Sequence, residues 1–128
     1  MRWHKKTLRA VNTTRGTLVG ESIRVADTAL TGIVGLLGER ELLPGDGLLI
    51  VPSQGVHTVG MRFAIDVVFL DGEWNVIAIR RHMRPFRMTR VFWKAAGVLE
   101  LRSGIIDSSN TLVGDTLEFS RPDAAARI

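Results

Sequence analysis

The sequence contains no cysteine and no long apolar run, and each absence removes a class of protein. Without cysteine, the 128-residue chain has no disulfide framework, no thiolate zinc site and no cysteine nucleophile. No apolar stretch approaches the roughly 20 residues that cross a bilayer, so we expect no transmembrane segment. The basic first residues are not followed by the apolar region of a signal peptide, which favours a cytoplasmic location.

The motifs that usually mark catalysis or cofactor binding are also missing. Neither Gly-x-x-x-x-Gly-Lys nor Gly-x-Gly-x-x-Gly occurs, and Ser53 is not part of a Gly-x-Ser-x-Gly elbow. The histidines His4, His57 and His82 are scattered and form no His-x-His or His-Glu-x-x-His pair. We therefore expect no metal and no cofactor.

What remains is typical of one small globular domain. Hydrophobic residues make up 45% of the chain and charged residues 23%, which are ordinary values. Several short apolar segments separated by turn signals predict a mainly β (α+β) fold, either a β-sandwich or a partly closed barrel, over residues 16–120. We expect residues 1–15 to be a basic tail or an edge strand, and residues 121–128 to be a frayed tail.

One helix and several strands follow from the spacing of apolar residues. Leu30, Ile33, Val34 and Leu37 recur at helical spacing and predict a short helix near residues 27–38. The segments 83–93 and 105–112 are predicted to be connections, the first with at most one helical turn. The predicted strands are 17–25 (broken near Gly20), 48–51, 65–70, 74–79, 98–102 and 116–120.

The strongest pattern lies in residues 57–72. In an extended chain Asp66, Val68 and Leu70 point to one side, and Ile65, Val67 and Phe69 point to the other. Both sides are apolar, so this segment is expected to be a central strand with the Asp66 carboxylate in poorly hydrated surroundings. The whole stretch is too long for one strand, which predicts a bend near Ala64, and Asp71-Gly72 predicts a hairpin.

Five positions are candidates for a ligand site: His57, Gly60, Arg62, Asp66 and Glu100. Asp66 has either a functional role with a perturbed proton affinity or a structural one, accepting backbone N–H groups. His57 is either a base or ligand, or a hydrogen-bonded boundary residue. Gly60 marks a bulge or a place where a ligand approaches the backbone. Glu100 is expected on the outward side of its strand, as a solvated carboxylate.

Positive charge is concentrated in two stretches: Arg2, Lys5, Lys6 and Arg9 form the first, and residues 80–94, which include no acidic residue, form the second. The formal net charge is +4 and the sequence pI is near 10.6. The stretch 80–94 is either a solvated basic face or a site for anions or nucleic acid. Nucleic acid is considered because Phe86, Phe92 and Trp93 alternate with the cations of this stretch. Those aromatics are alternatively needed to cover a small core. The candidate anion-binding residues are Arg80, Arg81, Arg84, Arg87, Arg90 and Lys94.

Several segments together resemble the domain of unknown function 192 family. The carriers are Gly35-Leu36-Leu37-Gly38, Gly45-Asp46-Gly47-Leu48, His57-Thr58-Val59-Gly60-Met61-Arg62-Phe63-Ala64-Ile65-Asp66-Val67-Val68-Phe69-Leu70-Asp71, Val98-Leu99-Glu100-Leu101 and Gly114-Asp115. The resemblance implies a compact β-rich domain with one helix, many exported or lipid-anchored relatives and no established activity. Two positions depart from the pattern: Ala64, where relatives often have proline, and Ser53, near a frequent cysteine.

Three functions remain open. The leading hypothesis is a non-catalytic binding or accessory domain that receives a small polar or anionic ligand, or a protein partner, near His57, Arg62 and Asp66. The second is a hydrolase that uses His57 with Asp66. The third is binding of nucleic acid or another anion through residues 80–94. A metal site made of His57, Asp66 and Glu100 requires the fold to gather them.

Overall fold

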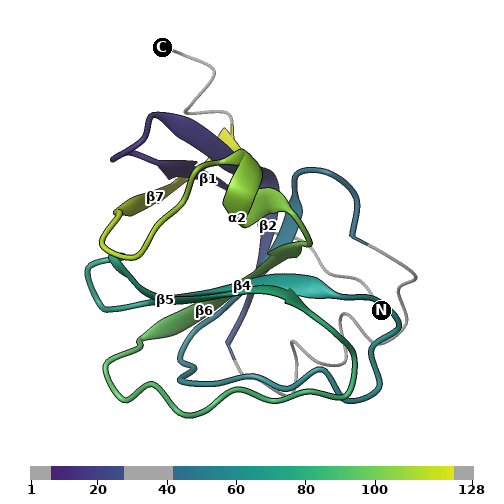
Figure 1. Ribbon diagram of the computed structural model, residues 1–128. Coiled ribbons are helices and arrows are strands. Elements are labelled where there is room, and N and C mark those ends of the chain that lie inside the picture. Colours follow the sequence, from purple (N-terminus) through teal and green to yellow (C-terminus); the bar gives the residue numbers. More distant parts are fainter. Residues whose placement is uncertain (1–6, 28–41, 123–128) are drawn as a thin grey trace.

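The computed structural model describes residues 7–27 and 42–122, which form strands, loops and one short helix (Figure 1). This mainly β architecture confirms the expected fold class. The predicted helix near residues 27–38 lies outside the described residues, apart from Asp27. The elements in chain order are β1 (Thr7–Asn12), β2 (Thr17–Ala26), β3 (Asp46–Ile50), β4 (Ile65–Leu70), β5 (Val76–Met83), β6 (Gly97–Arg102), α2 (Ile105–Ser108) and β7 (Leu117–Ser120).

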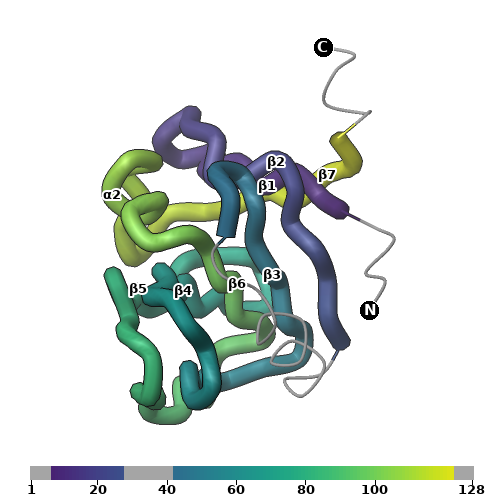
Figure 2. The backbone as a smooth tube through the Cα atoms, turned by 90° about the vertical axis from the view of Figure 1, so that its right-hand side faces the viewer, coloured from purple at the N-terminus to yellow at the C-terminus, as the bar shows by residue number. Residues whose placement is uncertain are grey.

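The described strands form one curled sheet in the order β5-β4-β6-β3-β2-β1-β7. Neighbouring strands are antiparallel except β2 and β3, which pair in parallel. The two edges approach each other where β5 and β7 begin: Leu117 N–H donates to Trp74 O at 3.0 Å and Val76 N–H donates to Asp115 O at 2.7 Å. The sheet is therefore a half-barrel, closed at one corner, as Figure 2 also shows.

Strand β4 is central in this sheet and buried on both sides, as its sequence pattern predicts. All six of its residues are buried. Val68 and Leu70 belong to the apolar cluster enclosed by the curl of the sheet. Ile65, Val67 and Phe69 belong to a second cluster on the other face. The strand begins directly after Ala64, and the Asp71-Gly72 turn leads into β5 as an antiparallel hairpin.

Two loops cover the second cluster. Residues 52–60 and 84–92 run side by side below the sheet in Figure 1, joined by an isolated antiparallel bridge between His57 and Met88. The buried Thr58 side chain strengthens the pairing, because its Oγ1 donates to Arg84 O at 2.6 Å and accepts from Arg87 N–H at 2.9 Å. We call residues 84–96 the basic loop. It contains no helical turn.

Three local expectations differ from the structure. Residues 7–12 are neither a tail nor an edge strand, because β1 has β2 on one side and β7 on the other. Strand β2 is not broken at Gly20; the register against β1 shifts there instead. The connection expected over residues 105–112 begins with α2. No helix among the described residues is long and apolar enough to cross a membrane.

Candidate functional site

Both oxygens of the Asp66 carboxylate accept hydrogen bonds from backbone N–H groups. Its Oδ1 accepts the His82 N–H at 2.8 Å, and its Oδ2 accepts the Gly104 N–H at 3.0 Å and the Ile106 N–H at 2.9 Å. The side chain is buried, with 1% of its residue surface exposed. Asp66 thus connects the end of β5 and the first turn of α2 to the central strand. This arrangement matches the structural role considered for it from the sequence.

The other candidates on the central stretch lie in the loop before β4 and make local contacts. His57 Nδ1 accepts the Val59 N–H at 3.3 Å. Gly60 has a φ of 87° in a turn where Met61 N–H donates to Thr58 O, so the turn itself requires glycine. Arg62 is exposed. Ser53 Oγ donates to Gly55 O at 2.9 Å and is not bonded to His57, so no triad is assembled.

Glu100 is buried, and the expectation of a solvated carboxylate was wrong. Only 4% of its surface is exposed, because it lies between Leu48 and Val67 in the register of β6 with its two neighbours. That face of the sheet is covered by the loops described above, which strand alternation alone does not reveal. Burial raises the pKa of the Glu100 carboxyl to about 7.

The five predicted ligand residues do not converge. Asp66 pairs with Leu101, and Glu100 pairs with Val67, so the two carboxyl groups face opposite sides of the sheet. Within residues 7–27 and 42–122, no three histidine, aspartate or glutamate side chains are grouped to hold a metal ion. A ligand role for these residues stays a prediction.

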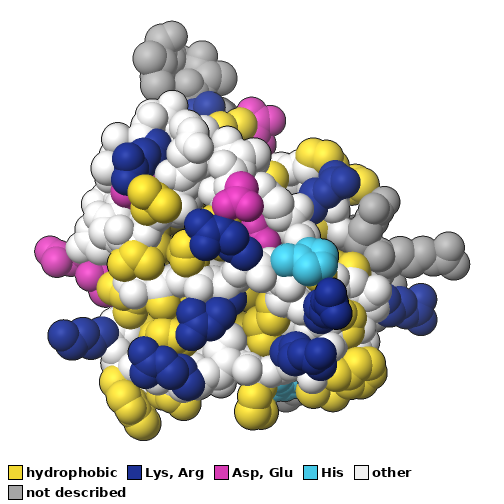
Figure 3. All heavy atoms as spheres, in the orientation of Figure 1, with side chains coloured by type: hydrophobic (Ala, Val, Ile, Leu, Met, Phe, Trp, Pro, Cys, Tyr) yellow, Lys and Arg dark blue, Asp and Glu magenta, His cyan; other side chains and the backbone are white. Residues whose placement is uncertain are grey.

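The basic stretch, in contrast, forms one exposed surface. Figure 3 shows basic side chains among hydrophobic ones over the lower half of the view, where β5 and the basic loop lie. Arg81 donates from Nε to Asp107 Oδ1 at 2.7 Å; no other cation of this stretch has a carboxylate partner among the described residues. We call this surface the basic apolar face; its exposed residues are Arg80, Arg84, Phe86, Arg87, Met88, Arg90, Val91, Trp93 and Lys94.

Phe92 anchors this face in the core. Its ring packs on Phe69 with centroids 4.3 Å apart. The guanidinium carbons of Arg90 and Arg80 lie 4.3 Å and 5.2 Å from its centroid, which is cation–π distance. Beside the ring is an open cleft of about 300 Å³, lined by Ile77, Arg90, Phe92, Trp93 and Lys94.

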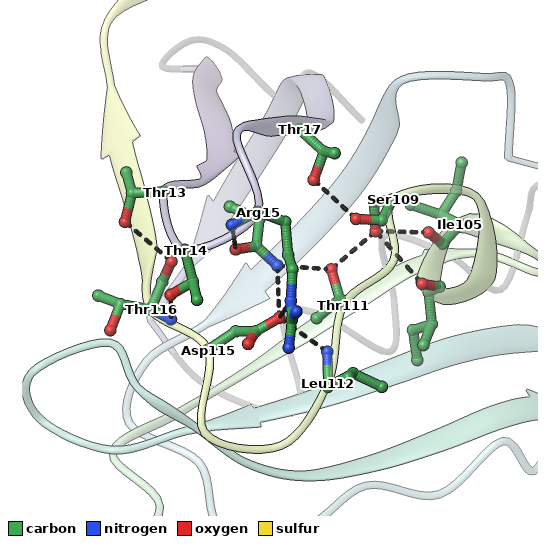
Figure 4. A network of polar contacts seen from close by, with 12 residues as sticks. Thr13, Thr14, Arg15, Thr17, Ile105, Ser109, Thr111, Leu112, Asp115 and Thr116 are labelled. Carbon is green, nitrogen blue, oxygen red and sulfur yellow. Dashed lines mark hydrogen bonds and ion pairs between the residues drawn. The ribbon is translucent and has the colours of Figure 1, made fainter.

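A buried polar network, which the sequence analysis missed, joins the β1–β2 turn to the loop before β7 (Figure 4). Asn12 Nδ2 donates to Thr111 Oγ1 at 3.1 Å and to Asp115 Oδ2 at 3.0 Å. Arg15 Nε donates to the same Asp115 oxygen at 3.0 Å. No spacing signal links these residues, because the bonds span 99 to 103 positions of chain.

Hydrogen bonds determine the charge state of this network. Burial alone would raise the pKa of Asp115, but donation from Arg15, Asn12 and the Leu112 N–H outweighs it and lowers the pKa to about 2. The hydrogen bond to Asp115 and the negative charge of Asp115 in turn raise the pKa of Arg15. An open cleft of about 410 Å³ lies beside the network, lined by Arg15, Arg81, Ile106, Asp107, Asn110, Thr111 and Leu112.

Comparison with known proteins decides the family. The model of DUF192, described as an uncharacterized ACR family, matches residues 10–119. The chain belongs to the DUF192 family. Two UPF0127 proteins are each 29% identical to this DUF192 chain over 117 residues. The match covers 85% of this chain and 73% of the Thermococcus sibiricus protein, and 87% of this chain and 97% of the Pyrococcus furiosus protein.

Two crystal structures share the fold of this DUF192 chain. A candidate transcription regulator from Sinorhizobium meliloti 1021 matches with a TM-score of 0.76 and 20% identity, covering 93% of this chain and 96% of that one. A protein of unknown function from Novosphingobium aromaticivorans matches with a TM-score of 0.73 and 18% identity, covering 88% and 83%. At identities of 20% and 18%, these matches show a shared fold and nothing about function. The match to the family model over residues 10–119 confirms the family resemblance expected from the sequence.

Proposed function

We propose that this DUF192 chain is a non-catalytic binding domain that contacts a phosphate-rich polyanion through its basic apolar face. One observation carries the proposal: Arg80, Arg84, Arg87, Arg90 and Lys94 are exposed together, with no carboxylate partner among the described residues. Arginines that serve only solubility are usually interspersed with acidic groups. A dense positive surface attracts anions and loses that attraction as salt screens it.

The alternatives receive less support from the geometry. A ligand at Asp66 would compete with three backbone donors that already occupy both oxygens. A hydrolase would need His57 close to a nucleophile or an orienting carboxylate, and Ser53 and Asp66 are each bonded elsewhere. A binding role at the basic apolar face requires no rearrangement of these contacts.

The test is titration of the chain with inorganic polyphosphate by calorimetry at several salt concentrations. We expect the logarithm of the affinity to fall linearly with the logarithm of salt concentration. Reversal of one charge in Arg87→Glu should weaken binding and reduce that slope. The matched control is Arg121→Glu, which makes the same charge change at an exposed position outside the face.

Two results would contradict the proposal. Affinity that does not depend on salt would show that phosphate charge is not what the face recognises. An equal loss in Arg87→Glu and Arg121→Glu would show that only the net charge matters.

A further inference from the structure

We infer that the polyanion is a single-stranded nucleic acid, one base of which stacks against Trp93 in the cleft beside Phe92. This inference rests on the proposed binding role of the basic apolar face and adds the class of partner and the point of contact.

The cleft combines an aromatic wall with cations at its rim. Trp93 is 79% exposed, while Phe92 beside it is only 8% exposed and provides an apolar floor together with Ile77. Arg90 and Lys94 also line the cleft. Its volume of about 300 Å³ is at the lower end for small-molecule sites, which suits one planar ring rather than a large ligand.

The backbone that presents Trp93 is held firmly. Gln54 Nε2 donates to Trp93 O at 2.8 Å, and Gln54 O accepts the Phe92 N–H at 2.8 Å. The turn that contains Trp93 is closed by Ala95 N–H donating to Phe92 O at 2.9 Å. A large exposed aromatic on a fixed backbone loses little conformational entropy when it stacks on a ligand, so it is a favourable contact residue.

Two guanidinium groups are positioned to meet the phosphates that flank such a base. Arg90 and Arg80 are held over the Phe92 ring at 4.3 Å and 5.2 Å. A cation–π contact leaves N–H groups of a guanidinium available for phosphate oxygens, although Arg80 Nη1 already donates to Ile79 O at 2.8 Å. Stacking of bases on aromatics with arginine at the backbone is the usual chemistry of single-strand binding.

A single strand fits this cleft better than a duplex or a membrane. In a duplex the faces of the bases are already stacked and cannot reach Trp93. A membrane surface would be met by apolar side chains such as Phe86 and Met88, which are exposed on the same face, whereas the cleft itself is lined by Trp93 together with Arg90 and Lys94. Binding to a membrane is therefore an outcome that the experiment must be able to detect.

The experiment compares three probes on the full chain: an oligothymidine, an abasic oligonucleotide of the same length and charge, and vesicles of phosphatidylserine and phosphatidylcholine. Fluorescence anisotropy measures the oligonucleotides and cosedimentation measures the vesicles. We expect oligothymidine to bind more tightly than the abasic strand. Trp93→Ala should weaken oligothymidine binding by about tenfold or more and leave the abasic strand unaffected.

Two variants separate stacking from general loss of apolar surface. Trp93→Phe keeps an aromatic face and should retain most of the affinity. Leu18→Ala removes another exposed apolar side chain, 44% exposed on β2, and should change nothing. Thermal unfolding of each variant confirms that the fold is retained.

The outcomes distinguish this inference from the proposed function. If oligothymidine and the abasic strand bind equally, and Trp93→Ala has no effect, stacking is refuted while the polyanion role stands. If vesicles bind and neither oligonucleotide does, the partner class is wrong. If polyphosphate and both oligonucleotides all fail to bind, both proposals fall.

Discussion

Asp66 and Glu100 lie on adjacent strands one register position apart, yet their carboxyl groups face opposite sides of the sheet. The Asp66 carboxylate accepts three backbone N–H groups. The Glu100 carboxyl lies between two apolar neighbours, and its pKa is raised to about 7 by burial. The two groups therefore affect the free energy of unfolding in different ways, and each can be tested separately.

Replacement of Asp66 by asparagine should destabilise the fold. The change removes the negative charge and places an amide N–H₂ against backbone donors, so we expect the free energy of unfolding to fall by about 3 kcal/mol. Urea denaturation measures it. The control is Asp107→Asn, whose side chain is 70% exposed and, among the described residues, is bonded only to Arg81; it should change stability by about 0.5 kcal/mol or less. Unchanged stability of Asp66→Asn would refute the structural role.

Glu100 should make the protein less stable as pH rises. Its folded pKa of about 7 lies above the ordinary value of 4.5, so the folded state holds the proton more tightly between those two values. The free energy of unfolding then decreases as pH rises from 4.5 to 7, by about 3 kcal/mol in all. Denaturation at a series of pH values measures this decrease.

The variant Glu100→Gln should lose that pH dependence and exceed the wild type in stability at pH 8. Glu118→Gln, at an exposed position of β7, is the matched control and should keep the wild-type profile. A wild-type profile in Glu100→Gln would assign the dependence to another group.

Asp115 should have the opposite effect in a more acidic range. Its pKa is lowered from 3.8 to about 2, so its hydrogen bonds stabilise the fold above pH 3.8 and are lost as the pH falls toward 2. Because Arg15 is 39% exposed, solvent screens this pair, and we expect a loss of about 1 kcal/mol. Denaturation between pH 4 and pH 2 measures it, and Asp115→Asn should flatten the curve.

Together the carboxyl groups of Glu100 and Asp115 place their combined stability maximum between pH 3.8 and 4.5.

The parts of the fold that were predictable depend on neighbours in sequence. Alternation along β4 identified a strand buried on both sides, and Asp71-Gly72 identified the hairpin that follows it. The same alternation failed for Glu100, because it shows which way a side chain points but not whether a loop covers that side. Here the covering residues include Met61 and Phe92, which lie in the loops before β4 and before β6.

The sequence alone determined the fold class, the family, the central strand and the concentration of cations in residues 80–94, since composition and short-range periodicity carry that information. Only the tertiary structure decided which polar groups are hydrogen-bonded to one another. The donors to Asp66 come from 16, 38 and 40 residues away, and Asn12 reaches Asp115 across 103. The curl of the sheet and the loops beneath it make these contacts, and they leave the basic apolar face exposed.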